Sequence, residues 1–500
     1  MSTPRHAAPD GPAVILGGGI AGLAAARLLA RHYSRVLVLE RDQRAAVASP
    51  EEAFTGWERS GVPQFRHSHA FLGRVRLVLL AHLPDVLDRL RAVGAREIGL
   101  AETVPPGMEL IPRPDDEDVV LLACRRATFE WALRESVALR PGIELREGVT
   151  VTGLIAEGAN GGRPQVVGVR LADGTAVPAA LVVDASGRRS RAPEWLAALG
   201  VPAPRELSFE TGIFYYTRFY RLRRARAPRG TTGLVAGDLG WIKLAIFPGD
   251  ADTFSITVGT PTDEPRLKGL SDPRRFERFV RAFPSVAPWR VNGASVPIAG
   301  ADTPVLVMGQ LRNRLRRFVD RDGPLLPGFV ALGDAAYHSN PIYGRGATSA
   351  LVQAALLDEA VGRHPTDLVA MARHLDRRSE EELRPFWDAA VSGDRRALRI
   401  ERAEPTSTKA WLVGMAEEAV GWFVDRGIVP AMRVEPAVFR GLMRVFNMLK
   451  PPDRLLRDPE ILARTLPVLA RVLRGEEPPD LFAPVRRADA LALLGPDADG

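Results

Sequence analysis

The chain has 500 residues, too many for one small core, so two or three structural units are expected. Its composition, 46% hydrophobic and 25% charged, is globular and excludes a fibrous or disordered class. The net charge is +7, but the 67 basic residues are nearly all Arg and are scattered among 60 acids, which argues against nucleic-acid binding. The densest basic run, residues 218–229, is expected to be a surface loop or strand end.

The single cysteine, Cys124, excludes an internal disulfide and is expected to be a small buried residue. Residues 1–12 lack the apolar stretch of a signal peptide. No apolar run approaches the ~20 residues that cross a bilayer, so we expect a cytoplasmic protein without membrane insertion.

The first fifty residues predict a βαβ unit. Residues 13–16 form an apolar run typical of a buried parallel strand, and residues 17–22 read Gly-Gly-Gly-Ile-Ala-Gly. A helix is expected over 23–32, followed by a second buried strand over 35–39 that ends at Glu40. This order is that of a dinucleotide-binding fold.

The next elements are less regular. Residues 43–66 are expected to be a loop because Pro and Gly recur there. Helices are expected over 71–80, 86–93 and 127–139, and strands over 142–155, 166–171, 176–178 and 181–183.

Beyond residue 205 short β-rich runs predict a mixed sheet, with strands over 212–220, 240–247 and 253–260 and a helix over 273–282. A strand over 329–332 and a helix over 348–362 follow. Helices are then expected over 408–425, 436–449 and 459–474, before a poorly packed tail at 485–500.

The glycine turn has a specific chemistry. Gly17 permits the tight turn, Gly19 lets a pyrophosphate approach the backbone, and Gly22 lets helix and strand pack closely. The N-terminus of the helix offers unpaired N–H groups to phosphates, and Glu40 is placed to accept hydrogen bonds from a ribose. The alternative is that the glycines serve packing alone.

Two later segments point to a flavin rather than to a nicotinamide cofactor alone. The run 181–190 is an apolar strand that ends in D-x-x-G-x-x-S, with Asp184 and Gly187. The run 328–346 is an apolar strand ending in Gly333-Asp334, then a Pro/Gly-rich turn before a helix. An Asp at such a strand end can hold a ribityl hydroxyl, and the N–H groups of the next helix can face the flavin edge where negative charge develops.

Together these three segments resemble FAD-dependent monooxygenases of the aromatic-hydroxylase type. The resemblance implies that Asp184 and Gly187 serve FAD and the passage of NAD(P)H, that Asp334 binds the ribityl chain, and that the turn 344–346 lies at the flavin ring. It also implies that Arg126, just before a helix, contacts FAD.

A finer resemblance rests on residues 59–69, R-x-G-V-P-Q-x-x-H-x-H, and on 340–344, Asn-Pro-Ile-Tyr-Gly. These segments are similar to the bacterial flavin-dependent polyene epoxidases of polyether biosynthesis, in which the first lies beside the flavin. Arg345 departs from the Gln or His that many flavin monooxygenases place between the two glycines. The cofactor-binding residues expected from all these motifs are Gly17, Gly19, Ile20, Ala21, Gly22, Glu40, Arg41, Arg59, Gln64, Arg126, Asp184, Gly187, Asp334, Pro341, Gly344 and Gly346.

The resemblance implies an α/β fold whose Rossmann-like FAD-binding domain comprises 12–204 and 321–380. A mixed-sheet substrate domain over 205–320 and a helical region over 381–484 complete the expected organisation. The aromatic cluster at 215–220 lines either an apolar substrate pocket or an ordinary sheet face. The apolar faces of the C-terminal helices serve as core, as a lid over the pocket, or as a membrane-surface contact.

No catalytic side chain or metal site is assigned. His67 and His69 lack the further ligands of a metal site, so they either contact the flavin or pack beneath it. His338 serves either as a general base or to shape its turn.

The function implied is an FAD-dependent monooxygenase of secondary metabolism such as antibiotic biosynthesis. Through a C4a-(hydro)peroxyflavin it would transfer one oxygen atom of O2 to an apolar polyketide, polyene or aromatic substrate, by epoxidation or hydroxylation. NAD(P)H, directly or through a flavin reductase, would supply the electrons. The alternatives are a prenyl reductase of the geranylgeranyl-reductase type, a non-enzymatic flavoprotein, and a halogenase, whose W-x-W-x-I-P segment is not matched at Trp241-Ile242-Lys243.

Overall fold

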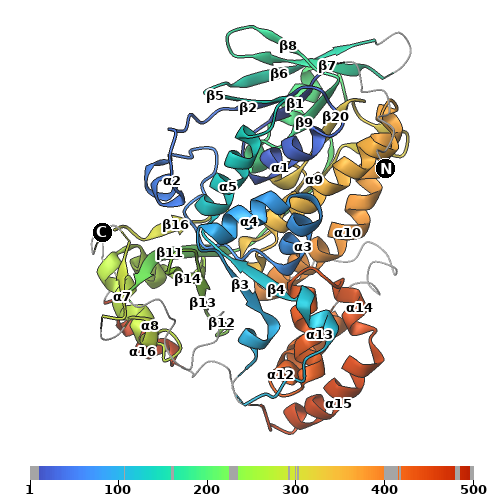
Figure 1. Ribbon diagram of the computed structural model, residues 1–500. Helices are drawn as coiled ribbons and strands as arrows, with labels where there is room; N and C mark the ends of the chain where they lie inside the picture. The colour runs from blue at the N-terminus through green and yellow to red at the C-terminus, as the bar shows by residue number, and fades with distance from the viewer. Residues whose placement is uncertain are drawn as a thin grey trace.

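The computed structural model describes residues 11–105, 107–158, 163–223, 235–290, 293–298, 300, 303–398, 415, 418–478 and 485–495. Figure 1 shows a parallel sheet with its helices, a separate antiparallel sheet carrying its own helices, and a C-terminal helical group. Half of the basic run 218–229, residues 224–229, and half of the expected helix 408–425, residues 408–414, 416 and 417, lie outside the described residues.

A five-stranded parallel sheet forms the first unit, in the order β20-β9-β1-β2-β5. Its strands are β1 (Ala13–Leu16), β2 (Val36–Glu40), β5 (Ile143–Glu147), β9 (Leu181–Asp184) and β20 (Phe329–Ala331). Leu16 pairs with both Leu39 and Asp184, so the carboxyl ends of the three central strands lie level. The loops that follow these strands therefore meet at one edge of the sheet.

Helices cover one face of this sheet, and a small antiparallel sheet lies over the other (Figure 1). The helices are α1 (Ile20–Leu29), α3 (Gly73–His82), α4 (Pro84–Ala92), α5 (Arg126–Ala138) and α9 (Gly346–Arg363). The covering sheet consists of β6 (Val151–Glu157), β7 (Gln165–Leu171) and β8 (Ala176–Pro178), with α6 (Ala192–Ala198) beside it. Because both faces are covered, the central strands are continuous apolar runs.

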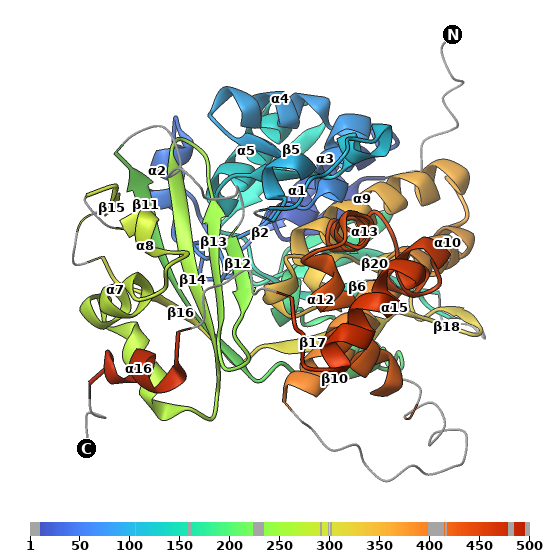
Figure 2. The same ribbon diagram turned by 90° about the horizontal axis from the view of Figure 1, so that it is seen from below.

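A six-stranded sheet forms the second unit, in the order β12-β13-β14-β11-β15, with β16 also paired to β11. Its strands are β11 (Ile213–Leu222), β12 (Val235–Asp238), β13 (Lys243–Pro248), β14 (Thr253–Pro261), β15 (Ser295–Pro297) and β16 (Leu306–Met308). All of its described pairs are antiparallel, whereas a mixed sheet was expected. Figure 2 shows α7 (Pro273–Arg281), α8 (Ala287–Arg290) and α16 (Arg487–Ala492) on one side of it.

The C-terminal part is helical, as expected. It contains a π-helical turn at Val424–Ile428 and the helices α12 (Val429–Met432), α13 (Pro436–Phe446), α14 (Pro452–Leu456) and α15 (Pro459–Leu473). The long helix α10 (Leu368–Ala397) packs against α9 and runs through the domain boundary expected at 380. The remaining pairings join β3 (Arg96–Gly99) to β4 (Val120–Ala123), β17 (Arg312–Arg317) to β10 (Arg205–Glu210) and β21 (Tyr337–His338), and β18 (Val319–Asp320) to β19 (Gly323–Pro324).

Besides the mixed sheet, two further expectations were wrong. The loop expected over 43–66 contains helix α2 (Pro50–Gly56), because Pro50 occupies the first helical position, where its missing N–H costs nothing, and Ser49 caps the helix. The tail expected to pack poorly contains α16, whose Ala490 and Leu491 are buried in the core of the second sheet. Leu494, just after α16, is buried with them.

Candidate functional site

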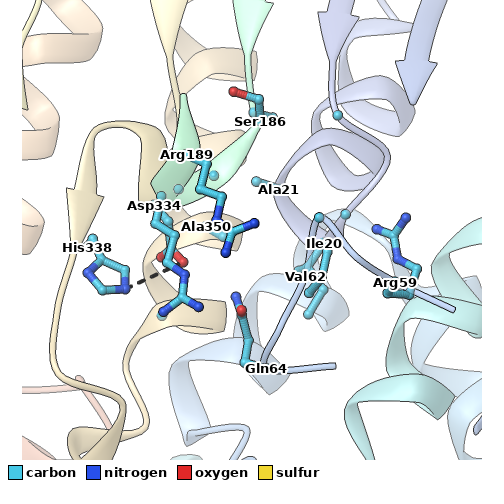
Figure 3. Close-up of a pocket in the computed structure, with 18 of the residues that line it drawn as sticks. Ile20, Ala21, Arg59, Val62, Gln64, Ser186, Arg189, Asp334, His338 and Ala350 are labelled. Atoms are coloured by element: carbon cyan, nitrogen blue, oxygen red, sulfur yellow. Dashed lines mark ion pairs between the residues drawn. The ribbon is translucent and has the colours of Figure 1, made fainter. Parts of the chain in front are cut away.

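A cavity of about 340 Å³ lies at the edge of the parallel sheet where the strands end. Most of its wall comes from four segments far apart in the chain: the glycine turn, residues 59–70, residues 185–191 and residues 333–350. Figure 3 shows Ile20, Val62 and Arg59 on one side of it and Asp334 and Arg189 facing them.

The glycine turn is built as its motif requires. Gly17 has φ +104°, and a Cβ there would lie 2.6 Å from the carbonyl oxygen of Ala185. A Cβ on Gly22 would lie 1.8 Å from the carbonyl oxygen of Gly17, so only glycine fits. Among the described residues no side chain caps α1, whose N-cap is Gly19. The first amides of α1 therefore remain available to an anion in the cavity.

Glu40 lies at the end of β2 and lines the same cavity. Its Oε2 accepts a hydrogen bond from the Gly18 amide at 2.8 Å and lies 3.1 Å from Nη1 of Arg59. Its Oε1 accepts from the Asp42 amide at 2.9 Å. Because a carboxylate offers about four acceptor sites, one site on Oε1 remains for a ligand hydroxyl.

Three buried arginines surround the fully buried Glu130 on α5. The nearest nitrogens of Arg44, Arg59 and Arg126 lie 3.1, 2.9 and 3.6 Å from its carboxylate oxygens. Burial lowers the pKa of Arg126. Nη2 of Arg59 and Nε of Arg126 are buried, and no described residue accepts a hydrogen bond from them. Arg59 and Arg126 both line the cavity, so the site keeps spare cationic donors beside it.

His69 is held in one tautomer by its neighbours. Its Nδ1 lies 2.9 Å from the carbonyl oxygen of His67, which can only accept, and its Nε2 lies 3.3 Å from Nη1 of Arg126, which can only donate. Burial, reinforced by Arg126, lowers the pKa of His69 to about 3. The ring is therefore neutral and helps to orient Arg126.

His67 stands between the cavity and the antiparallel sheet. Its Nδ1 lies 3.2 Å from the hydroxyl of Thr217 on β11. Burial and the nearby Arg188 lower the pKa of His67 to about 4, so this ring is also neutral near pH 7.

The turn after β20 brings Asp334 to the cavity (Figure 3). Nε2 of His338 lies 4.0 Å from its carboxylate, while Nδ1 of His338 donates to the carbonyl oxygen of Arg312. His338 thus shapes the turn, although it also lines the cavity. Burial lowers the pKa of Arg188, which lies near Asp334 on the facing segment.

Asp184 lies beneath the cavity and does not line it. Its carboxylate accepts hydrogen bonds from the amide of Ser186, at 3.0 Å, and from the hydroxyls of Ser186 and Ser190. Burial raises its pKa. Asp184 holds the turn 185–190 against the sheet, and the turn contributes the wall.

Fourteen of the sixteen expected cofactor-binding residues line the cavity, and Gly22 and Asp184 lie behind it. The cavity also contains residues that were not expected, among them Arg188, Arg189, Arg191 and Trp195. The three arginines lie in or just after the D-x-x-G-x-x-S segment. Positive charge at the carboxyl end of a strand could therefore have predicted that they line the cavity. Arg345 points elsewhere: it donates to the carbonyl of Phe386, and burial lowers its pKa to about 10.

A second cavity of about 260 Å³ adjoins the first. The residues that line both are His67, Ser68, Phe247, Met308 and Pro341. Tyr215 also lines it, whereas Tyr216 and Tyr220 pack into the core of the sheet. Phe446 at the end of α13 also lines it, so one C-terminal helix contributes to the pocket wall.

Other expectations concern the rest of the molecule. Cys124 is buried, as expected, and burial raises its pKa. Within the described ranges no three His, Cys, Asp or Glu side chains are grouped as metal ligands. No helix in the part of the chain that the structure describes has the length and apolar character needed to cross a membrane.

The chain is similar to known proteins both in its first segment and over most of its length. The model of the NAD(P)-binding Rossmann-like domain matches residues 15–73. Protein Rv3254 of Mycobacterium tuberculosis is 27% identical over 479 residues, which cover 89% of this chain and 91% of that protein.

Two solved structures show the fold. PqsL, a probable FAD-dependent monooxygenase from Pseudomonas aeruginosa, is 19% identical with a TM-score of 0.53, over 78% of this chain and 96% of its own. PqsL has also been solved in complex with 2-aminobenzoylacetate. The flavin-dependent brominase Bmp2 is 18% identical with a TM-score of 0.55, over 90% of this chain and 98% of its own. The chain therefore has the fold shared by FAD-dependent monooxygenases and halogenases, with a Rossmann-like segment at residues 15–73.

Proposed function

We propose that the protein is an FAD-dependent oxygenase that uses NAD(P)H as reductant. The observation that carries the proposal is the pair of adjoining cavities. One ends at the uncapped N-terminus of α1 and at arginines with spare donors, and the other is lined mainly by apolar side chains. The first suits the phosphates of a dinucleotide, and the second suits an apolar substrate.

The residues present fit FAD. The α1 amides and the spare Nη2 of Arg59 would hold the pyrophosphate, and the free acceptor site of Glu40 would take a ribose hydroxyl. Asp334 would hold the ribityl chain, and Gly344 and Gly346 would face the flavin ring. When bound and reduced, FAD supplies the electron pair that activates O2.

The protein side chains then position the substrate and exclude water. Phe247, Met308, Ile342 and Phe446 give the second cavity an apolar lining, and His67 is the neutral group at the junction of the two cavities. Such a pocket favours an apolar unsaturated substrate, such as a polyene, polyketide or aromatic ring, for epoxidation or hydroxylation.

The test uses the purified protein loaded with FAD. We expect it to be yellow, to bind FAD one to one, and to consume O2 with NAD(P)H faster when a suitable polyene or phenol is present. Saturation of a substrate double bond without O2 would overturn the oxygenase proposal in favour of a prenyl reductase. Failure to bind FAD would overturn the proposal altogether.

Halogenation is the second candidate, because the brominase Bmp2 shares the fold over 90% of this chain. The same assay with added bromide or chloride separates the two. A halogenated product detected by mass spectrometry supports halogenation, and a product heavier by one oxygen atom supports oxygenation.

A further inference from the structure

One short segment, residues 339–344, separates the two cavities. Pro341 lines both of them, Ser339 and Gly344 line the first, and Ile342 lines the second. Helix α9 begins directly after it, and the first residues of α9, Gly346 and Ala347, line the first cavity. The position of this segment therefore sets both the wall facing the flavin and the wall facing the substrate.

Asn340 anchors the segment through every polar atom of its side chain. It is buried, and its backbone amide donates to Oδ1 of Asn313 on β17 at 2.8 Å. Its Oδ1 accepts from the Ile342 amide at 3.2 Å and from the hydroxyl of Tyr215, which lines the second cavity. Its Nδ2 donates to Oδ1 of Asp394 at 2.9 Å.

Asp394 on α10 accepts hydrogen bonds from the side chains of three residues around this segment. Its Oδ2 accepts from Nδ2 of Asn313 at 2.6 Å, and its Oδ1 accepts from the hydroxyl of Tyr343 at 3.0 Å as well as from Asn340. Asp394 is only 5% exposed, and its three partners are neutral donors. A buried carboxylate with this set of donors can satisfy all three, whereas an amide in its place presents an N–H₂ group to at least one of them.

Gly393, the residue before Asp394, leaves room for the hydroxyl of Tyr343 to reach Asp394. A Cβ on Gly393 would lie 2.5 Å from the Tyr343 hydroxyl, so a larger residue would displace that ring. On its other side the guanidinium of Arg345 lies 4.9 Å from the centre of the Tyr343 ring. Helix α10 is thus shaped to receive this tyrosine as well as to bond it.

We propose that Asp394 is a positioning residue that, through Asn340, Asn313 and Tyr343, fixes the segment between the flavin and the substrate cavity. The proposal rests on the proposed function for its flavin part. Asp394 lines neither cavity, so it acts only through its partners. If the segment shifted, the N-terminal amides of α9 that border the first cavity would move with it, and a reduced flavin held there would lose the stabilisation that these amides give to negative charge.

The first measurement needs no cofactor. In Asp394→Asn, at least one of the side-chain donors that bind Asp394 loses its acceptor, so the segment is held less firmly. Hydrogen exchange of the amides of Asn340 and Ile342 is therefore expected to become about tenfold faster. Tyr343→Phe removes the hydroxyl that donates to Asp394 and to the carbonyl oxygen of Ala390 but leaves the other two donors of Asp394 in place, so a smaller change in the same direction is expected. The matched control is Asp388→Asn on the same helix, whose carboxylate makes an exposed ion pair with Arg384.

The second measurement is the reduction potential of bound FAD. In Asp394→Asn the ratio of reduced to oxidised FAD at a fixed potential is expected to fall about tenfold, which is about 30 mV for a two-electron couple. The affinity for oxidised FAD is expected to stay within about twofold of the wild-type value, because the phosphate site at α1 is untouched. A merely structural role would lower stability without this selective shift.

The proposal is overturned if Asp394→Asn and Asp388→Asn have the same hydrogen-exchange rates at Asn340 and Ile342. It is also overturned if the two variants have the same FAD reduction potential. If the wild-type protein does not bind FAD, the proposed function fails, while the exchange measurement on the cofactor-free protein still decides whether Asp394 holds the segment. The two failures are therefore distinguishable.

Discussion

Individual residues at the cavity either face it or hold in place those that do. Gly22 and Asp184 belong to the second kind: one lets α1 pack on the turn before it, and the other ties the turn 185–190 to β9. Both were expected from motifs, because the motif records the whole turn and not only its contacts. Asp394 was not expected, since nothing near it in the sequence marks a carboxylate that serves residues fifty or more positions away.

Two glycines of the same turn are expected to respond differently to alanine. In Gly22→Ala the new Cβ would collide with the carbonyl oxygen of Gly17, so the free energy of unfolding is expected to fall by about 1–3 kcal/mol. In Gly19→Ala the Cβ meets no atom within 4 Å, so stability is expected to hold while FAD affinity falls. Urea unfolding and FAD titration measure the two effects. Equal loss of stability in both variants would contradict this separation of roles.

The buried neutral histidines predict how stability depends on pH. The folded-state pKa of His69 is about 3, below the usual histidine value of 6.5, so below pH 6.5 the unfolded chain binds a proton that the folded chain does not. Its contribution to stability is therefore complete above pH 6.5 and is lost as the pH falls toward 3. Each pH unit in that window removes up to about 1.4 kcal/mol.

Urea unfolding between pH 7 and pH 4 tests this sign. His69→Gln keeps an acceptor for Arg126 and carries no titrating ring, so its stability is expected to depend less steeply on pH than that of the wild type. His364→Gln, outside both cavities, is the control. Parallel curves for wild type and His69→Gln would show that His69 does not titrate in this window.

At the scale of elements, local signals were sufficient where one physical rule decides the structure. The strands β1, β2 and β9 and the helix α1 were expected because apolar runs and the glycine turn determine them locally. Helix α2 was missed because Pro50 was taken as a loop signal although proline also opens helices. The apolar face of α13 was expected to serve as core, as a lid or as a membrane-surface contact, and only tertiary packing shows that its Phe446 lines the second cavity.

Asn447 is expected to fasten α13 to the first unit. It is fully buried, and its Oδ1 accepts from the Gly73 amide at 2.7 Å while its carbonyl accepts from the Arg74 amide at 3.1 Å. Asn447→Ala leaves the Gly73 amide without its acceptor, which is expected to cost about 1–3 kcal/mol of stability.

Hydrogen exchange locates the effect. In Asn447→Ala, protection of the amides of α13 and of the start of α3 is expected to fall while that of α1 is retained. Arg457→Ala, whose side chain is 81% exposed, is the control for substitution in this region. Unchanged protection in α13 would mean that its apolar face alone holds it in place.

At the scale of the whole molecule, each of the two large sheets packs into its own hydrophobic core. The half-buried β5 was expected only as part of the strand region 142–155, but the other four strands of the parallel sheet could be expected from the sequence, because each carries its own apolar run and turn. The relation between the two sheets could not, because it depends on single long-range pairs. The most buried of these joins Arg125, before α5, to Asp250, in the turn between β13 and β14.

Breaking that pair is expected to weaken the whole molecule. The side chains of Arg125 and Asp250 are 2% and 1% exposed, and Asp250 accepts from the amide, Nε and Nη2 of Arg125. Asp250→Ala leaves a buried guanidinium whose remaining carboxylate partner among the described residues is the half-exposed Glu51, which is expected to cost about 3–5 kcal/mol. Asp88→Asn, which breaks an exposed pair with Arg91, is expected to cost less than about 1 kcal/mol. Urea unfolding followed by tryptophan fluorescence measures the stability of both variants. Equal losses of stability in the two variants would show that this ion pair does not hold the sheets together. The hydrogen-bonded and apolar contacts around His67 would then do so.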